Sequence, residues 1–85
     1  MTLAEIEEKT NVFLANSLNV EKEKISPEAR LKEDMEIDSL DYIDIVVFLD
    51  KEFGIKILNP SEMADIKTLS QFNEFIYNRI PNNYG

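Results

Sequence analysis

Ser39 is the residue whose type and surroundings most clearly suggest chemistry, because it lies between two aspartates where a helical pattern begins. The stretch Asp34–Gly54 reads DMEIDSLDYIDIVVFLDKEFG, with Asp38 before the serine and Asp41 two residues after it. A catalytic serine needs an adjacent base, yet the 85-residue chain contains no histidine. Solvated carboxylates are too weakly basic for this task. Catalysis by the chain alone is therefore not expected.

Two other interpretations of Ser39 remain open. Its hydroxyl could simply cap the helix, since serine is a preferred N-cap whose oxygen accepts a bond from a free backbone N–H. Alternatively, Ser39 is the substrate of a separate enzyme, because a hydroxyl at a helix start is accessible and an attached phosphodiester would meet backbone N–H groups. Asp38 and Asp41 would oppose the added negative charge unless they help that enzyme by holding a cation.

Metal sites and thiol chemistry are not expected. The spacing Asp34-x-Glu36-x-Asp38 resembles the start of a calcium-binding loop, but such a loop needs glycine at its sixth position and glutamate at its twelfth. Those positions hold Ser39 and Ile45. The chain also lacks cysteine and histidine, so disulfides and the usual transition-metal ligands are missing.

The chain is strongly acidic, with 17 Asp and Glu residues against 9 Lys and Arg residues and a net charge of −8. Such a charge repels nucleic acid and anionic membranes and favours partners with basic patches, although it could also serve only solubility. No apolar run is long enough to span a membrane, and the N-terminus has no basic-then-apolar signal pattern. A cytoplasmic protein is expected.

The helix after Ser39 carries two apolar stripes. At 100° per residue, one stripe is predicted to pack in the core: Tyr42, Ile45, Val46, Leu49 and Phe53. The second stripe consists of Leu40, Ile43 and Val47, and it is interleaved with charged residues. Because one stripe suffices for a small core, the second indicates either a fully buried helix or a surface that meets another molecule, and the charges that border it favour the surface.

The remaining segments predict a small all-α bundle. A T-x-x-E capping box at Thr2 starts a helix near Leu3 that ends within 16–19. A long polar connection covers 20–33, held by apolar anchors, and 55–58 is an extended linker rather than a strand. A short helix is predicted over 61–66, and Thr68 is predicted to cap a last helix. We expect one helical domain over 1–80, with three longer helices and one short helix, followed by a frayed tail over 81–85.

The stretch from Asp34 through Phe53 resembles the acyl carrier proteins. The similarity includes the Asp38-Ser39-Leu40-Asp41 core and the acidic helix rich in Ile and Val. It also covers the long first loop, the short third helix and the Ile66–Leu69 approach to the last helix, and so nearly the whole chain.

The resemblance implies a four-helix bundle whose Ser39 carries a 4'-phosphopantetheine arm, added from coenzyme A by a separate Mg-dependent transferase. The thiol of the arm would hold acyl groups as thioesters, and Asp38 would help position the metal ion of the transferase. The implied contacts with acyl-transferring and chain-extending enzymes, which carry basic docking patches, are made by two groups of residues. The apolar group is Leu40, Ile43 and Val47, and the acidic group is Asp41, Asp44 and Asp50. A monomer is expected.

Four departures from the family pattern stand out. Glu36 occupies a position where glycine is usual, Phe48 stands where a small residue is frequent, and Lys51 stands where an acid is common. The segment Ile57–Asn59 is one residue longer than the common spacing before the third helix. None of these changes affects Ser39, but together they leave room for a specialised pathway instead of housekeeping fatty-acid synthesis.

The leading hypothesis is therefore a carrier of acyl groups for fatty-acid or polyketide-type biosynthesis, and not an enzyme. A close alternative is a carrier of aminoacyl, aryl or D-alanyl groups. An alternative of a different class is an unmodified helical adaptor that binds a basic partner.

Overall fold

The computed structural model describes residues 2–80, and the tail predicted over 81–85 lies outside this range. The described chain forms three α-helices: α1 (Leu3–Asn16), α2 (Asp41–Phe53) and α3 (Leu69–Arg79). Two single turns of 3-10 helix, η1 (Lys22–Lys24) and η2 (Pro60–Met63), lie in the connections. No strand is assigned over 2–80, which confirms the all-α prediction. The short fourth helix predicted over 61–66 is present only as the η2 turn.

Helix α1 begins and ends where the sequence predicts. The hydroxyl of Thr2 accepts the N–H of Glu5 at 3.2 Å, and the Glu5 carboxylate accepts the N–H of Thr2 at 2.8 Å, which is the predicted capping box. Asn19, just beyond the helix, has a φ of 58°. This left-handed conformation is one that asparagine tolerates better than most residues, and it turns the chain away from the helix axis.

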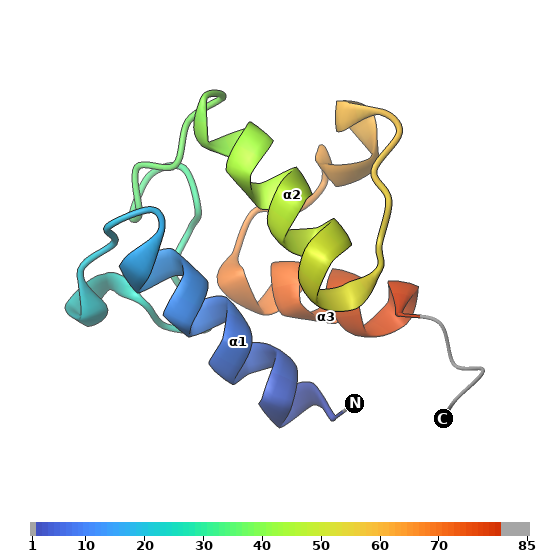
Figure 1. The fold of residues 1–85 in the computed structure, drawn as a ribbon. Coiled ribbons are helices and arrows are strands. Elements are labelled where there is room, and N and C mark those ends of the chain that lie inside the picture. Colours follow the sequence, from blue (N-terminus) through green and yellow to red (C-terminus); the bar gives the residue numbers. More distant parts are fainter. Residues whose placement is uncertain (1, 81–85) are drawn as a thin grey trace.

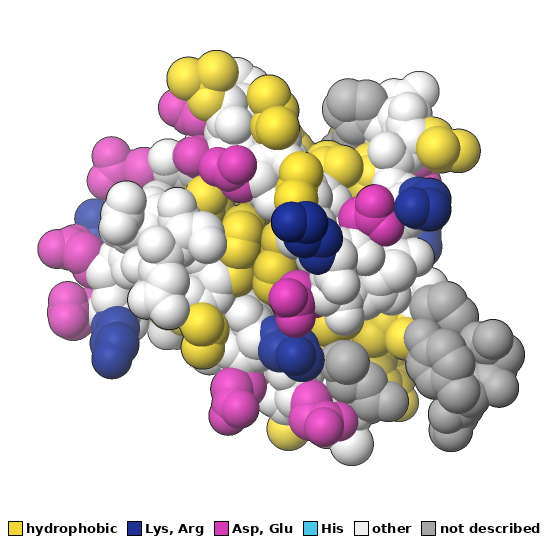
Figure 2. All heavy atoms as spheres, in the orientation of Figure 1, with side chains coloured by type: hydrophobic (Ala, Val, Ile, Leu, Met, Phe, Trp, Pro, Cys, Tyr) yellow, Lys and Arg dark blue, Asp and Glu magenta, His cyan; other side chains and the backbone are white. Residues whose placement is uncertain are grey.

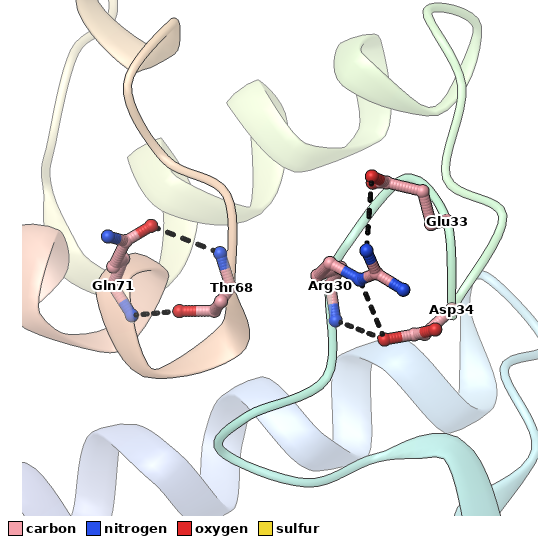
Figure 3. Close-up of polar contacts among 5 residues, drawn as sticks. All are labelled: Arg30, Glu33, Asp34, Thr68 and Gln71. Carbon is pink, nitrogen blue, oxygen red and sulfur yellow. Dashed lines mark hydrogen bonds and ion pairs between the residues drawn. The ribbon is translucent and has the colours of Figure 1, made fainter.

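Helix α3 also follows its prediction, and Figure 3 shows its cap. The hydroxyl of Thr68 accepts the N–H of Gln71 at 3.2 Å, while the Gln71 side chain accepts the N–H groups of Lys67 and Thr68. The backbone N–H groups of Leu69 and Ser70 donate instead to carbonyl oxygens in the long first loop. The loop therefore satisfies N–H groups that a helix start leaves free.

The long first loop is held in place by buried anchors and by backbone hydrogen bonds. Val20 and Ala29 are buried, and Ile25 and Leu31 pack partly buried against the core. Arg30 and Thr68 form an isolated antiparallel bridge, next to which the N–H of Leu31 donates to the Lys67 carbonyl at 2.9 Å. These contacts fix the path of the chain from α1 to the start of α2.

The three helices pack around one apolar core, and Figure 1 shows how they are arranged. Helix α1 packs against α3, and α1 meets α2 through the stacked rings of Phe13 and Phe48, whose centroids are 4.1 Å apart. The segment after α2 is extended, as predicted, and leads through η2 back to α3. None of the helices within 2–80 has the length and hydrophobicity that crossing a bilayer would require.

Candidate functional site

Ser39 lies in an exposed turn immediately before α2. Figure 1 shows the first turn of α2 at the top of the molecule, next to the end of the green loop. Within the described residues, the Ser39 hydroxyl makes no hydrogen bond to the protein, whereas both neighbouring aspartates do. The hydroxyl is thus accessible and not committed to a structural contact.

The N-cap of α2 is Leu40, which makes no side-chain cap bond, and the side chain that accepts the N–H groups at the start of the helix belongs to Asp38. The interpretation of Ser39 as the N-cap is therefore wrong. Oδ1 of Asp38 accepts the N–H of Leu40 at 3.0 Å and that of Asp41 at 3.3 Å. In return, Oδ2 of Asp41 accepts the N–H of Asp38 at 3.2 Å. This reciprocal pair has the form of a capping box. Because aspartate is as good a cap as serine, the serine one position later keeps its hydroxyl free.

The turn before Asp38 is closed by Asp34, as Figure 3 shows. Oδ2 of Asp34 accepts the backbone N–H of Arg30 at 2.8 Å, and the N–H of Asp34 donates to the Arg30 carbonyl at 3.0 Å. The first of these bonds, strengthened by the Arg30 guanidinium, holds the pKa of the Asp34 carboxyl below its ordinary value. Asp34 is therefore a structural residue that sets the approach to Ser39.

Glu36 has a φ of 58°. This left-handed conformation is the one that glycine adopts without steric cost. The backbone thus keeps the path expected of a glycine at this position, although the residue is glutamate. The Glu36 carboxylate forms an exposed ion pair with Lys24 at 3.4 Å, which links this strained position to the first loop.

The predicted partner-facing stripe lies on the surface. Leu40 is 77%, Ile43 68% and Val47 46% exposed, and their spacing puts them together on one side of α2. In Figure 2, apolar side chains gather along the course that α2 takes in Figure 1, and carboxylates flank their upper part. Asp44 is exposed and Asp41 is half-buried, while Asp50 is exposed and forms an ion pair with Lys56 at 3.1 Å.

The opposite stripe of α2 packs in the core, with two differences from the prediction. Ile45, Leu49 and Phe53 are buried and Val46 is half-buried, but Tyr42 remains 37% exposed beside Ser39.

Phe48 is a core residue that the predicted stripe does not include. Phe48 is buried because it stacks on Phe13 and meets Phe53 edge-to-face at 5.4 Å. Its spacing of three residues from Ile45 was the available signal. Leu3, the first residue of α1, is 38% exposed.

A cavity of about 310 Å³ opens beside Ser39. Asp38, Ser39 and Tyr42 contribute to its wall at the start of α2. The apolar part of the wall comes from α2, from the η2 region and from α3: Ile45, Met63, Ile66 and Phe72. The cavity therefore connects the surroundings of the serine with the apolar interior.

This site presents an exposed hydroxyl at the start of α2. Within 2–80, no group of three or more Asp and Glu side chains is arranged to hold a metal ion. One carboxylate oxygen of Asp38 and one of Asp41 accept backbone N–H groups, and no imidazole or thiol exists in the sequence. The geometry fits a residue that another enzyme modifies.

Comparison with known proteins agrees with this geometry. Residues 13–76 match the family model described as the phosphopantetheine attachment site. An acyl carrier protein from Thermosynechococcus vestitus is 40% identical over 81 residues, which cover 94% of this chain and 98% of the relative. An acyl carrier protein from Chlorobium phaeobacteroides is 35% identical over 77 residues, which cover 89% and 96% of the two chains. The chain belongs to the acyl carrier protein family, in which phosphopantetheine is the attached prosthetic group.

Proposed function

We propose that this chain carries acyl groups on a 4'-phosphopantetheine attached to the Oγ of Ser39. The observation that carries the proposal is the free hydroxyl: Ser39 is exposed, and the cap that the helix needs is supplied by Asp38 instead. A modifying enzyme can therefore reach Ser39 without disrupting α2.

The residues around Ser39 fit the group. The bound group supplies a terminal thiol, which the chain itself lacks, and this thiol holds the cargo as a thioester. Ser39 provides the oxygen for the phosphodiester link, and the start of α2 offers a positive dipole end to the phosphate. Asp38 and Asp41 place two carboxylates close to it, so a cation is needed while the phosphate is transferred.

We propose that Asp38 contributes one carboxylate oxygen to the Mg²⁺ ion of a separate phosphopantetheinyl transferase. Only Oδ1 of Asp38 is engaged in capping α2, which leaves Oδ2 for the ion. Carboxylate oxygens are preferred Mg²⁺ ligands. One carboxylate does not bind Mg²⁺ by itself, so in this proposal the ion belongs to the transferase.

The cargo is proposed to be an acyl chain. The cavity beside Ser39 has an apolar wall that includes Ile45, Met63 and Phe72, and an alkyl chain gains about 0.8 kcal/mol for each CH₂ group removed from water. This wall favours acyl cargo over aminoacyl, aryl or D-alanyl cargo. The proposed pathway class is fatty-acid or polyketide-type biosynthesis.

The proposed partners are the enzymes that load, extend and unload the chain. Leu40, Ile43 and Val47 would fill an apolar recess on the partner, while Asp41, Asp44 and Asp50 would face its basic residues. The exposure of the three apolar side chains supports this assignment, since a chain with no partner gains nothing from it.

The test is intact mass measurement after incubation with coenzyme A, Mg²⁺ and a broad-specificity phosphopantetheinyl transferase. We expect the wild type to gain one phosphopantetheine and Ser39→Ala to gain none. Ser26→Ala, a serine in the first loop, is the matched control and should still be modified. No gain in the wild type, with a transferase that modifies a known carrier in parallel, would refute the proposal.

The adaptor alternative makes a different prediction. An unmodified adaptor keeps its partner binding and cellular function in Ser39→Ala and loses both in Val47→Glu. A carrier loses its function in both variants. Complementation of a strain deleted for this gene, with each variant expressed at equal level, distinguishes the two.

A further inference from the structure

The exposed face of α2 does not carry a uniform charge, although the protein as a whole is acidic. Near Ser39, Asp41 and Asp44 have no ion-pair partner within 2–80. Their full negative charge is therefore presented beside the apolar residues Leu40 and Ile43. A partner approaching this end of the helix meets a negative potential.

The far end of the same face is different. Asp50 forms an exposed ion pair with Lys56 at 3.1 Å, and Glu52 forms one with Lys9 at 3.3 Å, which weakens but does not remove their negative charge. Lys51 lies between these two carboxylates in the sequence, is exposed and forms no ion pair within the described residues. This end of α2 thus presents a cation that its neighbouring carboxylates leave unpaired. In Figure 2, Lys and Arg side chains appear over the lower part of α2 and below the apolar strip.

Both ends belong to one surface. Asp44 and Lys51 are seven residues apart, which is close to two turns, so their side chains leave the helix on the same side about 10 Å apart along the axis. Val47 lies between them and is 46% exposed. Because the Debye length is about 8 Å at physiological salt, a partner group near one charge is largely screened from the other. A partner therefore interacts with the charges at each end of this face almost independently.

We propose that this face selects a partner enzyme whose docking surface is itself divided. The partner carries cations opposite Asp41 and Asp44, an apolar recess for Leu40, Ile43 and Val47, and a carboxylate opposite Lys51. An enzyme whose docking surface is basic along its whole length is disfavoured, because one of its cations would face Lys51. This inference rests on the proposed function, for which it names the chemistry of the partner.

The position of Lys51 in the last turn of α2 also suits the helix dipole, which favours cations near a C-terminus. That role alone predicts a loss of thermal stability when the charge is reversed and predicts nothing about partner choice. The two roles can therefore be separated by measuring unfolding and binding on the same variants.

The experiment uses a β-ketoacyl synthase of known structure whose carrier-docking patch is lined only by Arg and Lys. Binding of the unmodified chain is measured by titration calorimetry for the wild type, Lys51→Glu and Lys22→Glu. Lys22, in η1, gives the same change of net charge away from α2. We expect Lys51→Glu to bind this enzyme about three- to tenfold more tightly than wild type, and Lys22→Glu to bind within about twofold of wild type.

A second enzyme variant completes the cycle. In it, the docking-patch cation that faces the C-terminal end of the carrier helix is replaced by Glu. The enzyme variant should bind the wild-type chain more tightly than the wild-type enzyme does. It should bind the Lys51→Glu chain more weakly than the wild-type enzyme does. If Lys51→Glu gains no more affinity than Lys22→Glu, or if the preference does not reverse with the enzyme variant, the inference is overturned. All of these measurements use the chain without the prosthetic group, so a failure of Ser39 loading would refute the proposed function without altering this comparison.

Discussion

Asp38 and Ser39 have separate roles at the start of α2: one accepts backbone N–H groups, and the other presents a free hydroxyl. The carboxylate of Asp38 accepts the N–H groups of Leu40 and Asp41, and the hydroxyl of Ser39 makes no bond to the protein over 2–80. A serine that capped α2 would give up its cap upon modification. With aspartate in that position, substitution of Ser39 does not remove a side-chain hydrogen bond from the helix start.

This division predicts opposite outcomes for the two neighbouring residues. Asp38→Ala should lower the free energy of unfolding by about 1 kcal/mol, because α2 loses its cap. Ser39→Ala should change it by less than about 0.5 kcal/mol, as expected of an exposed residue without contacts. Urea unfolding followed by circular dichroism measures both. A destabilisation by Ser39→Ala as large as that by Asp38→Ala would mean that the serine also caps the helix.

Glu36 carries the backbone strain nearest to Ser39. A φ of 58° costs a residue with a side chain about 1 kcal/mol relative to glycine. Glu36→Gly should therefore stabilise the protein by about 1 kcal/mol in urea unfolding, even though its exposed ion pair with Lys24 is lost. Glu36→Ala is the control, because it loses the same ion pair and keeps the strain. Equal stabilisation by both variants would attribute the effect to charge instead of conformation.

At the level of the elements, the capping residues made α1 and α3 predictable from sequence. Thr2 and Thr68 each stand three residues before a Glu or Gln, and the structure confirms both boxes. The start of α2 was not resolved in the same way, since Asp38, Ser39 and Asp41 are all competent caps or first-turn residues. Which of these side chains caps α2 is shown only by the hydrogen bonds that the backbone N–H groups make in the folded protein.

Burial was predicted less completely than helix position. The 100° pattern separates the exposed Leu40, Ile43 and Val47 from the core, but it does not reveal that Phe48 has an aromatic partner on another helix. A short helix was predicted over 61–66, and within this segment Met63 is buried and Ile66 is partly buried against the core. The structure has only one turn there, Pro60–Met63, and its Glu62 forms an ion pair with Arg79 of α3, a contact that no local pattern contains.

Helices α1 and α3 each bury a polar group whose hydrogen-bonding capacity is not used. Thr10 and Asn73 are buried, and neither Thr10 Oγ1 nor Asn73 Oδ1 has a partner within the described residues. Thr10→Val keeps the shape and removes the hydroxyl, so it should raise the free energy of unfolding by about 1 kcal/mol. Thr68→Val, which removes the cap of α3, should lower it by about 1 kcal/mol. A loss of stability in Thr10→Val would show that its hydroxyl is satisfied in solution.

Glu62 joins η2 to the end of α3. Its Oε1 accepts the guanidinium of Arg79 at 2.7 Å, and its Oε2 accepts the N–H groups of Leu58 and Asn59. The hydrogen bond from Arg79 is the main reason that the pKa of Glu62 lies below its ordinary value of 4.5. The ionised form is favoured in the folded protein, so this contribution to stability is present above pH 4.5 and is lost as the pH falls through the lowered pKa.

The matching variant is Glu62→Gln, which keeps the shape of the side chain and cannot ionise. It should unfold at a lower temperature than wild type at pH 7, and the difference should shrink as the pH falls below 4.5. Thermal unfolding at several pH values between 7 and 3 measures this. A difference that stays constant over the whole range would show that the charge of Glu62 does not contribute.

At the level of the whole molecule, the charge of −8 and the divided face of α2 act on different steps of binding. The net charge acts at long range and attracts any basic enzyme, so it raises the rate of encounter. The local arrangement of Asp44, Lys51 and the Asp50–Lys56 pair acts after contact and governs how long the complex lasts.

These two steps respond differently to salt, which gives the last prediction. Between 20 mM and 500 mM NaCl, the association rate with a basic partner enzyme should fall several-fold, because screening shortens the range over which the acidic chain is attracted. The dissociation rate should change less, since the contact pairs are closer together than the Debye length.

Lys51→Glu alters the net charge by two units in a total of −8. It should therefore leave the dependence of the association rate on salt almost unchanged and should act mainly on the dissociation rate. Stopped-flow association and dissociation measurements on the wild type and Lys51→Glu test both statements. An association rate independent of salt would remove long-range attraction from the account, and an effect of Lys51→Glu confined to association would remove the role assigned to this residue after contact.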